Sequence, residues 1–587
     1  MNTQQHIIFG MDLGTTYSCT AYVDDAGKAV VLPNQEHQLT TPSIVLFEDD
    51  TRIVGEEAKN NALLNPEDVV EMVKRHMGEA DWRFQYKDRA YSPEEISSYI
   101  LRKLAADTQQ ALGIPVKEVI ITCPAYFGIA QREATARAGE IAGLHVHEVL
   151  SEPTAAAIAY GLQQVKDQTV LVFDLGGGTF DVTIIDLKKN ATVVIATGGD
   201  HHLGGRDWDE AVIRYLAHQW QISTESPEDP LNDPETLQDL WLKAEKAKIS
   251  LTVKPATRVV VSHGGRNVKV ELTRDKFNEL TASLLHRTIL FTRMTLDAAF
   301  ARGHRHIDQI VLVGGSTKMP QIAQRLELEF HLPYRLFEPD EAVAKGAALY
   351  GQRLLFQKKV HAQTFEIAKK TAEVASIAQK TANIATTPNT SPFIERLQPP
   401  APILKRQQQR ASAQTPAPSQ TPVPVVTATI PTMPETPSIT NVASHSFGII
   451  ATIDHGTPRE RKVISNLVRV NDPLPITQKR IYGTIEAGQD VVELEIIENT
   501  EETWIVEPEH FAEKARIGKV VITLPTGLPE NAPIEVIFEL NTQGRLHVTS
   551  REPHANTIID VAIETQGILS PQEVQQARQR AEHITIL

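Results

Sequence analysis

Residues 170–181 read Val-Leu-Val-Phe-Asp-Leu-Gly-Gly-Gly-Thr-Phe-Asp. The apolar run at its start is typical of a strand buried on both faces, and a turn rich in glycine follows it. Residues 7–18 have the same form, with Asp-Leu-Gly-Thr-Thr after the apolar residues. Glycines let the backbone approach phosphate oxygens, which exposed amides and hydroxyls bind. Two ordinary β-turns are the alternative, but the pair predicts two hairpins that clamp a nucleotide's phosphates, with Asp12 and Asp174 each holding a metal-bound water.

A third turn of this kind lies at residues 311–320, Val-Leu-Val-Gly-Gly-Ser-Thr-Lys-Met-Pro. It again places two glycines directly after an apolar run. A plain helix N-terminus is the alternative interpretation. Because it comes third in the series, the turn favours a contact with the nucleoside.

Strand-like and helix-like segments alternate from residue 1 to about residue 352. Apolar runs at 119–121 and 310–313 predict buried strands. Between them, Ser92-Pro93-Glu94-Glu95 is a capping box with proline at the first helical position, which predicts a helix start. The alternation indicates an α/β architecture for residues 1–352.

The rest of the chain divides into three parts. Residues 353–441 begin with an Ala-rich near-repeat at 367–386, for which a helix is an open alternative. They continue into a Pro/Thr/Gln-rich tract, which predicts an extended linker. Residues 442–567 alternate apolar and polar positions around turns and predict a β-sandwich, with a hairpin at 534–548. Residues 568–587 hold a second capping box, at Ser570, and predict one short helix.

Composition excludes several classes of protein. The 587 residues carry 58 basic and 73 acidic side chains, a net charge of −15, which argues against a nucleic-acid or acidic-membrane binder. Two cysteines, Cys19 and Cys123, give no disulfide framework, and we interpret both as small buried residues. The N-terminus does not read as a signal peptide, and no apolar run is long enough to span a bilayer. We therefore expect a cytoplasmic protein without a membrane partner.

The three turns resemble those of the actin-like ATPase superfamily, and the sequence between them narrows the match. Pro-Ala-Tyr-Phe stands at 124–127, Ser-Glu-Pro-Thr-Ala-Ala-Ala-Ile-Ala-Tyr-Gly at 151–161, and Glu-Pro-Asp-Glu-Ala-Val-Ala at 338–344. Together these strings resemble the 70-kilodalton heat-shock chaperone family, DnaK type. The resemblance implies an actin-like, two-lobed α/β ATPase domain, a β-sandwich peptide-binding domain and a C-terminal helix. It also implies a stress-response chaperone whose slow ATP hydrolysis regulates its affinity for unfolded proteins.

The resemblance assigns roles in the nucleotide site. The residues implied in hydrolysis are Asp12, Lys74, Glu152, Asp174, Thr179 and Asp181. Those implied in binding ATP or ADP are Gly14, Thr15, Thr16, Tyr17, Gly176, Gly177, Gly178, Gly204, Gly205, Glu245, Lys248, Gly314, Gly315, Ser316, Lys318 and Asp340. Asp12, Glu152 and Asp174 would hold Mg²⁺ largely through water, with K⁺ near Asp12 and Asp181. Lys318 stands where the family usually has Arg, so the charge is kept but planar stacking on adenine is lost.

The resemblance is weaker from Ser446 onward and implies a groove for extended apolar peptides. The pocket residues would be Ile449, Tyr482, Val492 and Leu494, and Ala451, Thr452 and Ile485 would lie near an arch over the peptide. For each of these residues, filling the sandwich core is an equal alternative. Client polypeptides, a J-domain co-chaperone and a GrpE-like nucleotide exchange factor are the implied partners.

Two departures from the family leave a second function open. The Pro-rich tract replaces the family's short leucine-rich linker, with Val423-Pro424-Val425-Val426 as an apolar segment that could dock, and the helical lid is reduced to its first helix. The replaced linker puts the coupling of ATP to peptide binding in doubt, and a groove without the full lid should release peptide quickly. The alternative is a nucleotide-gated scaffold or an exchange-partner-like protein with weak or no coupling. A sugar kinase or filament protein of the actin fold fits the β-rich region poorly.

Overall fold

The computed structural model describes residues 6–161, 166–189, 191–385, 438–507, 515–552, 557–562 and 568–587. They belong to two compact units. Residues 1–355 and 436–587 form the first, and residues 356–435 the second. The predicted apolar segment at 423–426 lies outside the described residues. In the described part of the chain, no helix is both long and apolar enough to cross a bilayer.

Lobe I is built on a sheet in the order β11-β10-β1-β2-β3. The first predicted hairpin is β1 (Ile8–Asp12) and β2 (Tyr17–Val23), paired antiparallel. The parallel strands β10 (Glu118–Cys123) and β11 (His145–Ser151) complete the core, and β3 spans Ala29–Leu32. Helices α2 (Pro93–Leu112) and α3 (Ile129–Ile141) cover this sheet, and the predicted capping box begins α2.

Lobe II repeats the plan with a sheet in the order β18-β17-β12-β13-β14-β19. The segment at 170–181 is the hairpin of β12 (Gln168–Leu175) and β13 (Phe180–Lys188), with Asp174 opposite Asp181. The third predicted strand is β17 (Gln309–Val313), parallel to β12. Strand β18 (Tyr334–Leu336) lies beside β17, and β14 (Ala191–Asp200) lies beside β13. The helices of this lobe are α4 (Glu152–Gly161), α5 (Gly205–Thr224), α6 (Pro234–Val253), α7 (Arg274–Leu280), α8 (Ala282–Ala301) and α9 (Pro320–Phe330).

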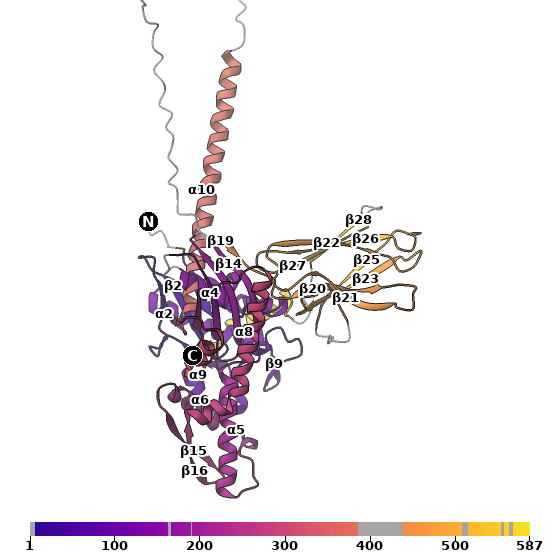
Figure 1. The fold of residues 1–587 in the computed structure, drawn as a ribbon. Coiled ribbons are helices and arrows are strands. Elements are labelled where there is room, and N and C mark those ends of the chain that lie inside the picture. The colour runs from indigo at the N-terminus through magenta and orange to yellow at the C-terminus, as the bar shows by residue number, and fades with distance from the viewer. Residues whose placement is uncertain are drawn as a thin grey trace, which may run out of the picture. The chain divides into compact units, whose positions relative to one another are not determined.

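The C-terminal region is a sandwich of two antiparallel sheets, as expected (Figure 1). One sheet has the order β24-β21-β20-β23-β25 and the other β22-β26-β27-β28. Their strands are β20 (Ser446–Ile453), β21 (Arg461–Val468), β22 (Ile476–Gly483), β23 (Val491–Asn499), β24 (Ile505–Val506), β25 (Arg516–Thr523), β26 (Pro533–Leu540), β27 (Leu546–Glu552) and β28 (Thr557–Ala562). β26 and β27 form the hairpin predicted at 534–548.

The segment predicted as linker has a helix at its start, as its Ala-rich composition allowed, and an unexpected strand at its end. Helix α10 (Ala342–Ala385) runs across residue 352 and includes most of the Ala-rich near-repeat. Beyond the tract, β19 (Ser438–Thr440) pairs in parallel with β14, so it adds an edge strand to the sheet of lobe II (Figure 1). The domain boundaries remain predictions. Residues 438–440 pair with lobe II, although no apolar pattern in the sequence predicted a strand there.

Helix α11 (Pro571–Glu582) starts at the predicted Ser570 capping box and packs on lobe I. Its buried side chains Val574, Ala577 and Ala581 join the core formed by α2 and α3. A two-residue strand, β29 (Thr585–Ile586), then pairs with β6 (Thr51–Val54) in a small sheet that also holds β5 (Val45–Glu48) and β7 (Val69–Val70).

Candidate functional site

A cleft with a cavity volume of about 440 Å³ lies between the turns of the two lobes. The sequence-predicted residues that line it are Asp12, Gly14, Thr15, Thr16, Tyr17, Lys74, Glu152, Asp174, Gly176, Gly177, Thr179, Glu245, Lys248, Gly314, Gly315, Ser316, Lys318 and Asp340. Four others lie directly behind this wall: Gly178, Asp181, Gly204 and Gly205. The cleft is large enough for a nucleotide, since ligand sites commonly span 300–1,000 Å³.

The two hairpins touch each other, as the sequence predicted. A Cβ atom on Gly177 would lie 2.0 Å from Thr16 Oγ1, and one on Gly178 would lie 2.3 Å from Thr15 Cγ2. These separations are shorter than any real contact, so glycine is required where the hairpins meet. Behind them, the Gly205 amide donates to the Gly176 carbonyl at 3.0 Å. The backbone amides and threonine hydroxyls of both lobes thus converge on one end of the cleft.

At that end, Lys74 forms a buried ion pair. It comes from a short 3-10 helix, η2 (Val73–His76), and its ammonium donates to Glu152 Oε1. The two side chains are only 3% and 9% exposed. Burial lowers the pKa of Lys74, but Glu152 and Asp12 outweigh it and raise the pKa, so Lys74 is charged. A fixed cation beside the phosphate-binding turns is what phosphoryl transfer requires.

Three aspartates surround this pair. Burial is the main cause that raises their pKa values, to about 7 for Asp12 and well above the ordinary range for Asp174 and Asp181, and the charge of Glu152 adds to it. Asp12 accepts from Thr122 Oγ1 at 2.9 Å, and Asp181 accepts from the Ala125 amide at 2.9 Å. Asp12 and Asp174 line this end of the cleft beside Lys74 and Glu152, so their carboxylates could face a further cation bound there.

If Mg²⁺ binds here with a nucleotide, Asp12, Glu152 and Asp174 are the cleft carboxylates that would hold it through water. No group of three or more His, Cys, Asp or Glu among the residues that the structure describes is arranged to ligate a metal directly. Mg²⁺ keeps several waters and takes few protein ligands in phosphate sites. Asp181 Oδ2 is buried without a hydrogen-bond donor from the described residues, as expected for a carboxylate that faces a bound cation or its water.

These pKa shifts predict the pH dependence of stability. Asp12 has a pKa of about 7 in the folded chain against an ordinary value of 3.8, so between these values the folded state binds more protons than the unfolded state. The free energy of unfolding of the nucleotide-free protein should therefore fall as pH rises from about 4 to about 7, by up to about 1.4 kcal/mol per pH unit for each such group. Denaturant titrations measure it. Asp12→Asn should flatten the slope, and a profile that rises over this range contradicts the assignment.

The nucleoside end of the cleft carries three ion pairs between described residues. Lys59 lies 2.5 Å from Glu245, and the Tyr17 hydroxyl donates to the same carboxylate at 3.0 Å. Lys318 pairs with Asp340, so the lysine that replaces the family's arginine remains at the predicted place. Lys248 does not stand free, because it pairs with buried Asp209 at 2.7 Å. Lys59 and Asp209 were missed in the sequence, since neither lies in a recognisable motif.

Arg206 was also missed, although it directly follows the predicted Gly204-Gly205. Its guanidinium lies 3.4 Å from the centre of the Trp241 ring and pairs with Glu71 at 2.6 Å. Arg206 and Trp241 belong to lobe II, whereas Glu71 precedes η2 in lobe I. The contact therefore closes the mouth of the cleft between the lobes.

Arg206→Ala should speed the release of bound ADP by roughly fivefold. The variant loses one partly exposed ion pair and one cation–π contact, each worth about 0.5–1 kcal/mol. Stopped-flow release of a fluorescent ADP analogue measures the rate. Arg214→Ala, which removes an exposed arginine of the same helix, is the control. An unchanged release rate for Arg206→Ala would show that this contact does not hold the lobes together.

In the sandwich, the predicted pocket residues gather in one core. Ile449 and Leu494 are buried, and Tyr482 and Val492 pack against the same cluster. The Tyr482 hydroxyl donates to Ser465 Oγ at 3.0 Å. Ala451 and Thr452 are half-buried, and Ile485 is 42% exposed. The core-filling alternative accounts for Ile449 and Leu494 in this arrangement, while Ile485 is available to a ligand.

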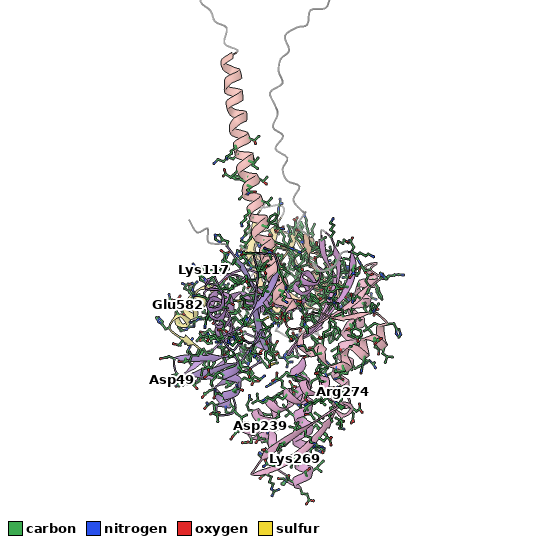
Figure 2. The ribbon with its side chains drawn as sticks, turned by 90° about the vertical axis from the view of Figure 1, so that its left-hand side faces the viewer. Asp49, Lys117, Asp239, Lys269, Arg274 and Glu582 are labelled. Atoms are coloured by element: carbon green, nitrogen blue, oxygen red, sulfur yellow. The ribbon has the colours of Figure 1, made fainter. Side chains whose placement is uncertain are left out.

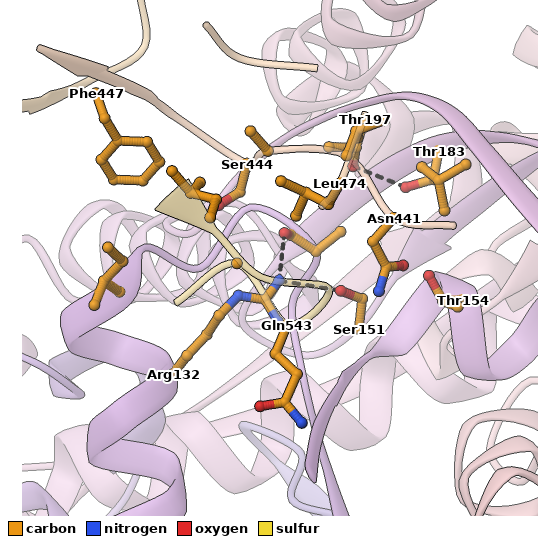
Figure 3. Close-up of a pocket in the computed structure, with 17 residues that line it drawn as sticks. Arg132, Ser151, Thr154, Thr183, Thr197, Asn441, Ser444, Phe447, Leu474 and Gln543 are labelled. Atoms are coloured by element: carbon orange, nitrogen blue, oxygen red, sulfur yellow. Dashed lines mark hydrogen bonds between the residues drawn. The ribbon is translucent and has the colours of Figure 1, made fainter. Parts of the chain in front are cut away.

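A much smaller cavity, of about 30 Å³, lies where the sandwich meets lobes I and II (Figure 3). Arg132 crosses it to donate to the Ala125 carbonyl at 2.8 Å and to Ser151 Oγ at 3.0 Å. Asn441, Ser444 and Gln543 approach from the C-terminal half. Ser151 directly precedes Glu152, so this junction borders the residue that holds Lys74.

Two lobes, each with a Gly/Thr-rich hairpin suited to binding phosphates and facing the other, and a buried lysine between them define a nucleotide-binding α/β protein of the actin-like class. The chain matches the family model described as Hsp70 protein over residues 8–369. Two proteins called "Chaperone protein DnaK", from two strains of Halobacterium salinarum, are each 44% identical to it over 352 residues, or 59% of this chain. The chain belongs to the Hsp70 family, and it spans about half, 55%, of the length of these two relatives.

Proposed function

We propose that this protein is an ATP-dependent molecular chaperone of the Hsp70 family. ATP in the cleft is hydrolysed slowly to ADP and phosphate, and the nucleotide state regulates how tightly the sandwich holds exposed apolar peptide segments. The observation that carries the proposal is the attachment of the sandwich to both ATPase lobes. That attachment gives the two sites a physical route through which each can influence the other.

In the cleft, Lys74 stabilises the charge that develops on the transferred phosphoryl group and orients the attacking water. Glu152 fixes Lys74, and Thr179 with Asp181 positions the water. The amides and hydroxyls of Thr15, Thr16 and the 176–178 turn bind the phosphates. Mg²⁺, held through water by Asp12, Glu152 and Asp174, supplies further positive charge at the phosphates. A K⁺ ion beside Asp12 and Asp181 is part of the same proposal.

Coupling rests on contacts with each lobe. On lobe II, β19 pairs with β14, and the buried amide of Thr197 donates to Asn471 Oδ1 at 2.8 Å. On lobe I, the Ile129 amide at the start of α3 donates to Glu498 Oε1 at 3.3 Å. A carboxylate at a helix N-terminus is favourable because of the helix dipole. Any change in the angle between the lobes must strain or release these contacts.

The same proposal covers partners and location. Extended or unfolded polypeptides are the clients, with a J-domain co-chaperone and a GrpE-like exchange factor as regulators. A cytoplasmic location agrees with two cysteines that are both free and buried. The scaffold alternative is not favoured, because the doubt about coupling came from the Pro-rich tract, whereas the contacts above bypass it.

A binding experiment tests the chaperone proposal. A fluorescent apolar heptapeptide should bind the purified protein, and a substitution of Ile485, such as Ile485→Asp, should weaken binding. Ile481→Asp is the matched control, because Ile481 is also exposed, at 60%, but lies outside the predicted groove. If the protein hydrolyses ATP but binds no apolar peptide or unfolded protein, the scaffold alternative replaces the chaperone proposal.

A further inference from the structure

Helix α11 and β29 are fastened to lobe I by main-chain hydrogen bonds. The Thr585 amide donates to the Asp50 carbonyl at 3.2 Å, and the Leu587 amide donates to the Arg52 carbonyl at 3.0 Å. In return, the Val54 amide donates to the Leu587 carbonyl at 2.9 Å. These bonds are the ladder of a parallel strand pair, so residues 585–587 occupy the edge of β6.

Arg102 of α2 fixes the chain just before this strand. Its guanidinium donates to the Ala581 carbonyl and, at 3.0 Å, to the Ile584 carbonyl. The last carbonyls of a helix lack partners within the helix, and a cation near them is favourable. One arginine of the ATPase lobe therefore binds both the end of α11 and the start of β29. An ion pair between Arg580 of α11 and Glu95 of α2, at 2.9 Å, also joins the two helices.

The side chains of this segment alternate as in a strand laid on a surface. Ile584 and Ile586 pack against the lobe I core, whereas Thr585 is exposed. Leu587 is 53% exposed. Figure 2 shows Glu582, at the end of α11, on the same side of the molecule as Asp49, which precedes β6. Main-chain bonds and two half-buried isoleucines make a small contact that can open locally.

We propose that the edge of β6 together with Arg102 is a β-augmentation site, separate from the sandwich groove, whose occupant is residues 584–587 of the same chain. Recognition is through the main chain, with Ile584 and Ile586 giving side-chain selectivity. Occupation in cis holds α11 on the ATPase half of the molecule. Release frees α11 and leaves β6 as an open edge. This inference does not depend on the proposed chaperone activity.

The test uses a version of the protein that ends at His583 and a labelled peptide of residues 582–587, Glu-His-Ile-Thr-Ile-Leu. Fluorescence anisotropy should show saturable binding to the shortened protein and at least tenfold weaker binding to the intact one, where the site is filled. Val54→Pro in the shortened protein should weaken binding at least tenfold, because it removes the Val54 amide that donates to the Leu587 carbonyl at 2.9 Å. Peptide bound in the sandwich groove would survive Val54→Pro.

A second measurement needs no truncation. In the intact protein, Arg102→Ala should raise the hydrogen-exchange rate of the Val54 amide by about tenfold, with Arg578→Ala on the exposed face of α11 as the control. The proposal is overturned if the peptide does not bind the shortened protein, binds both proteins equally or is insensitive to Val54→Pro. It is also overturned if Arg102→Ala leaves Val54 as protected as before.

Discussion

Lys74→Ala should reduce the rate of ATP hydrolysis at least 100-fold while Mg-nucleotide binding changes only a few-fold. Lys74 is buried beside Glu152 at the phosphate end of the cleft, where a preorganised cation is worth about 10²–10³ in rate. Most of the contacts that bind the nucleotide come from backbone and hydroxyl groups of the two hairpins, which the substitution leaves in place. Single-turnover hydrolysis measures the chemical step, and equilibrium titration measures binding.

Lys87→Ala is the matched control for this experiment. Lys87 is 59% exposed, and its partner Asp49 lies at the surface. Its loss should leave hydrolysis unchanged. If Lys74→Ala keeps more than about a tenth of the activity, the catalytic role of Lys74 is wrong, and the Lys74–Glu152 pair then only stabilises the fold.

Glu498→Lys should uncouple the two halves of the molecule. Glu498 accepts from the Ile129 amide and lies 3.3 Å from His445 Nδ1, and a Cβ atom on Gly128 would be only 2.8 Å from its Oε1. A lysine there repels the helix N-terminus and loses the hydrogen bond. Breaking a largely buried charged contact at an interface commonly costs 2–5 kcal/mol, enough to shift the docking equilibrium more than tenfold.

The measurement is the stimulation of ATP hydrolysis by an apolar peptide. Coupling between two binding sites is reciprocal. If ATP changes the affinity for a peptide, the bound peptide must also change the affinity for ATP. We expect Glu498→Lys to lower the stimulation ratio to about one. Glu493→Lys, the same change on the same strand at a site 55% exposed, should keep it. Equal stimulation in the two variants would mean that this contact does not transmit the signal.

The sequence predicted the ATPase half well because its signals are local. Hairpins with glycine at the points of closest approach, buried strands and the capping box at Ser92 each follow from neighbouring residues. Gly177 and Gly178 show why the motif is strict, since any side chain would strike the threonines of the other hairpin. The pairing of Lys74 with Glu152 could be placed only by resemblance, because these residues are distant in the sequence.

The features that the sequence missed are those that depend on distant surfaces. Nothing in Ser438-Ile439-Thr440 marks an edge strand of lobe II, since its partner β14 lies more than 240 positions earlier. Arg206 contacts Trp241 and Glu71, and the three residues come from three separate segments of the chain. The pairing of β29 with β6 likewise joins residues 585–586 to residues 51–52, which are far apart in the sequence. The Pro-rich tract was the reason to doubt coupling, and the contacts of β19, Asn471 and Glu498 with the two lobes, which the sequence did not predict, offer a route that does not run through it.

The central claim is that ATP and peptide binding are coupled through direct contacts of residues 438–499 with the ATPase lobes. The most direct test is the dissociation rate of a labelled apolar peptide from the intact protein, with ADP and with ATP. Coupling free energies of 1–3 kcal/mol correspond to factors of about 5–150, so we expect dissociation to be at least fivefold faster with ATP. Equal rates with both nucleotides, under conditions where both are bound, would contradict the claim.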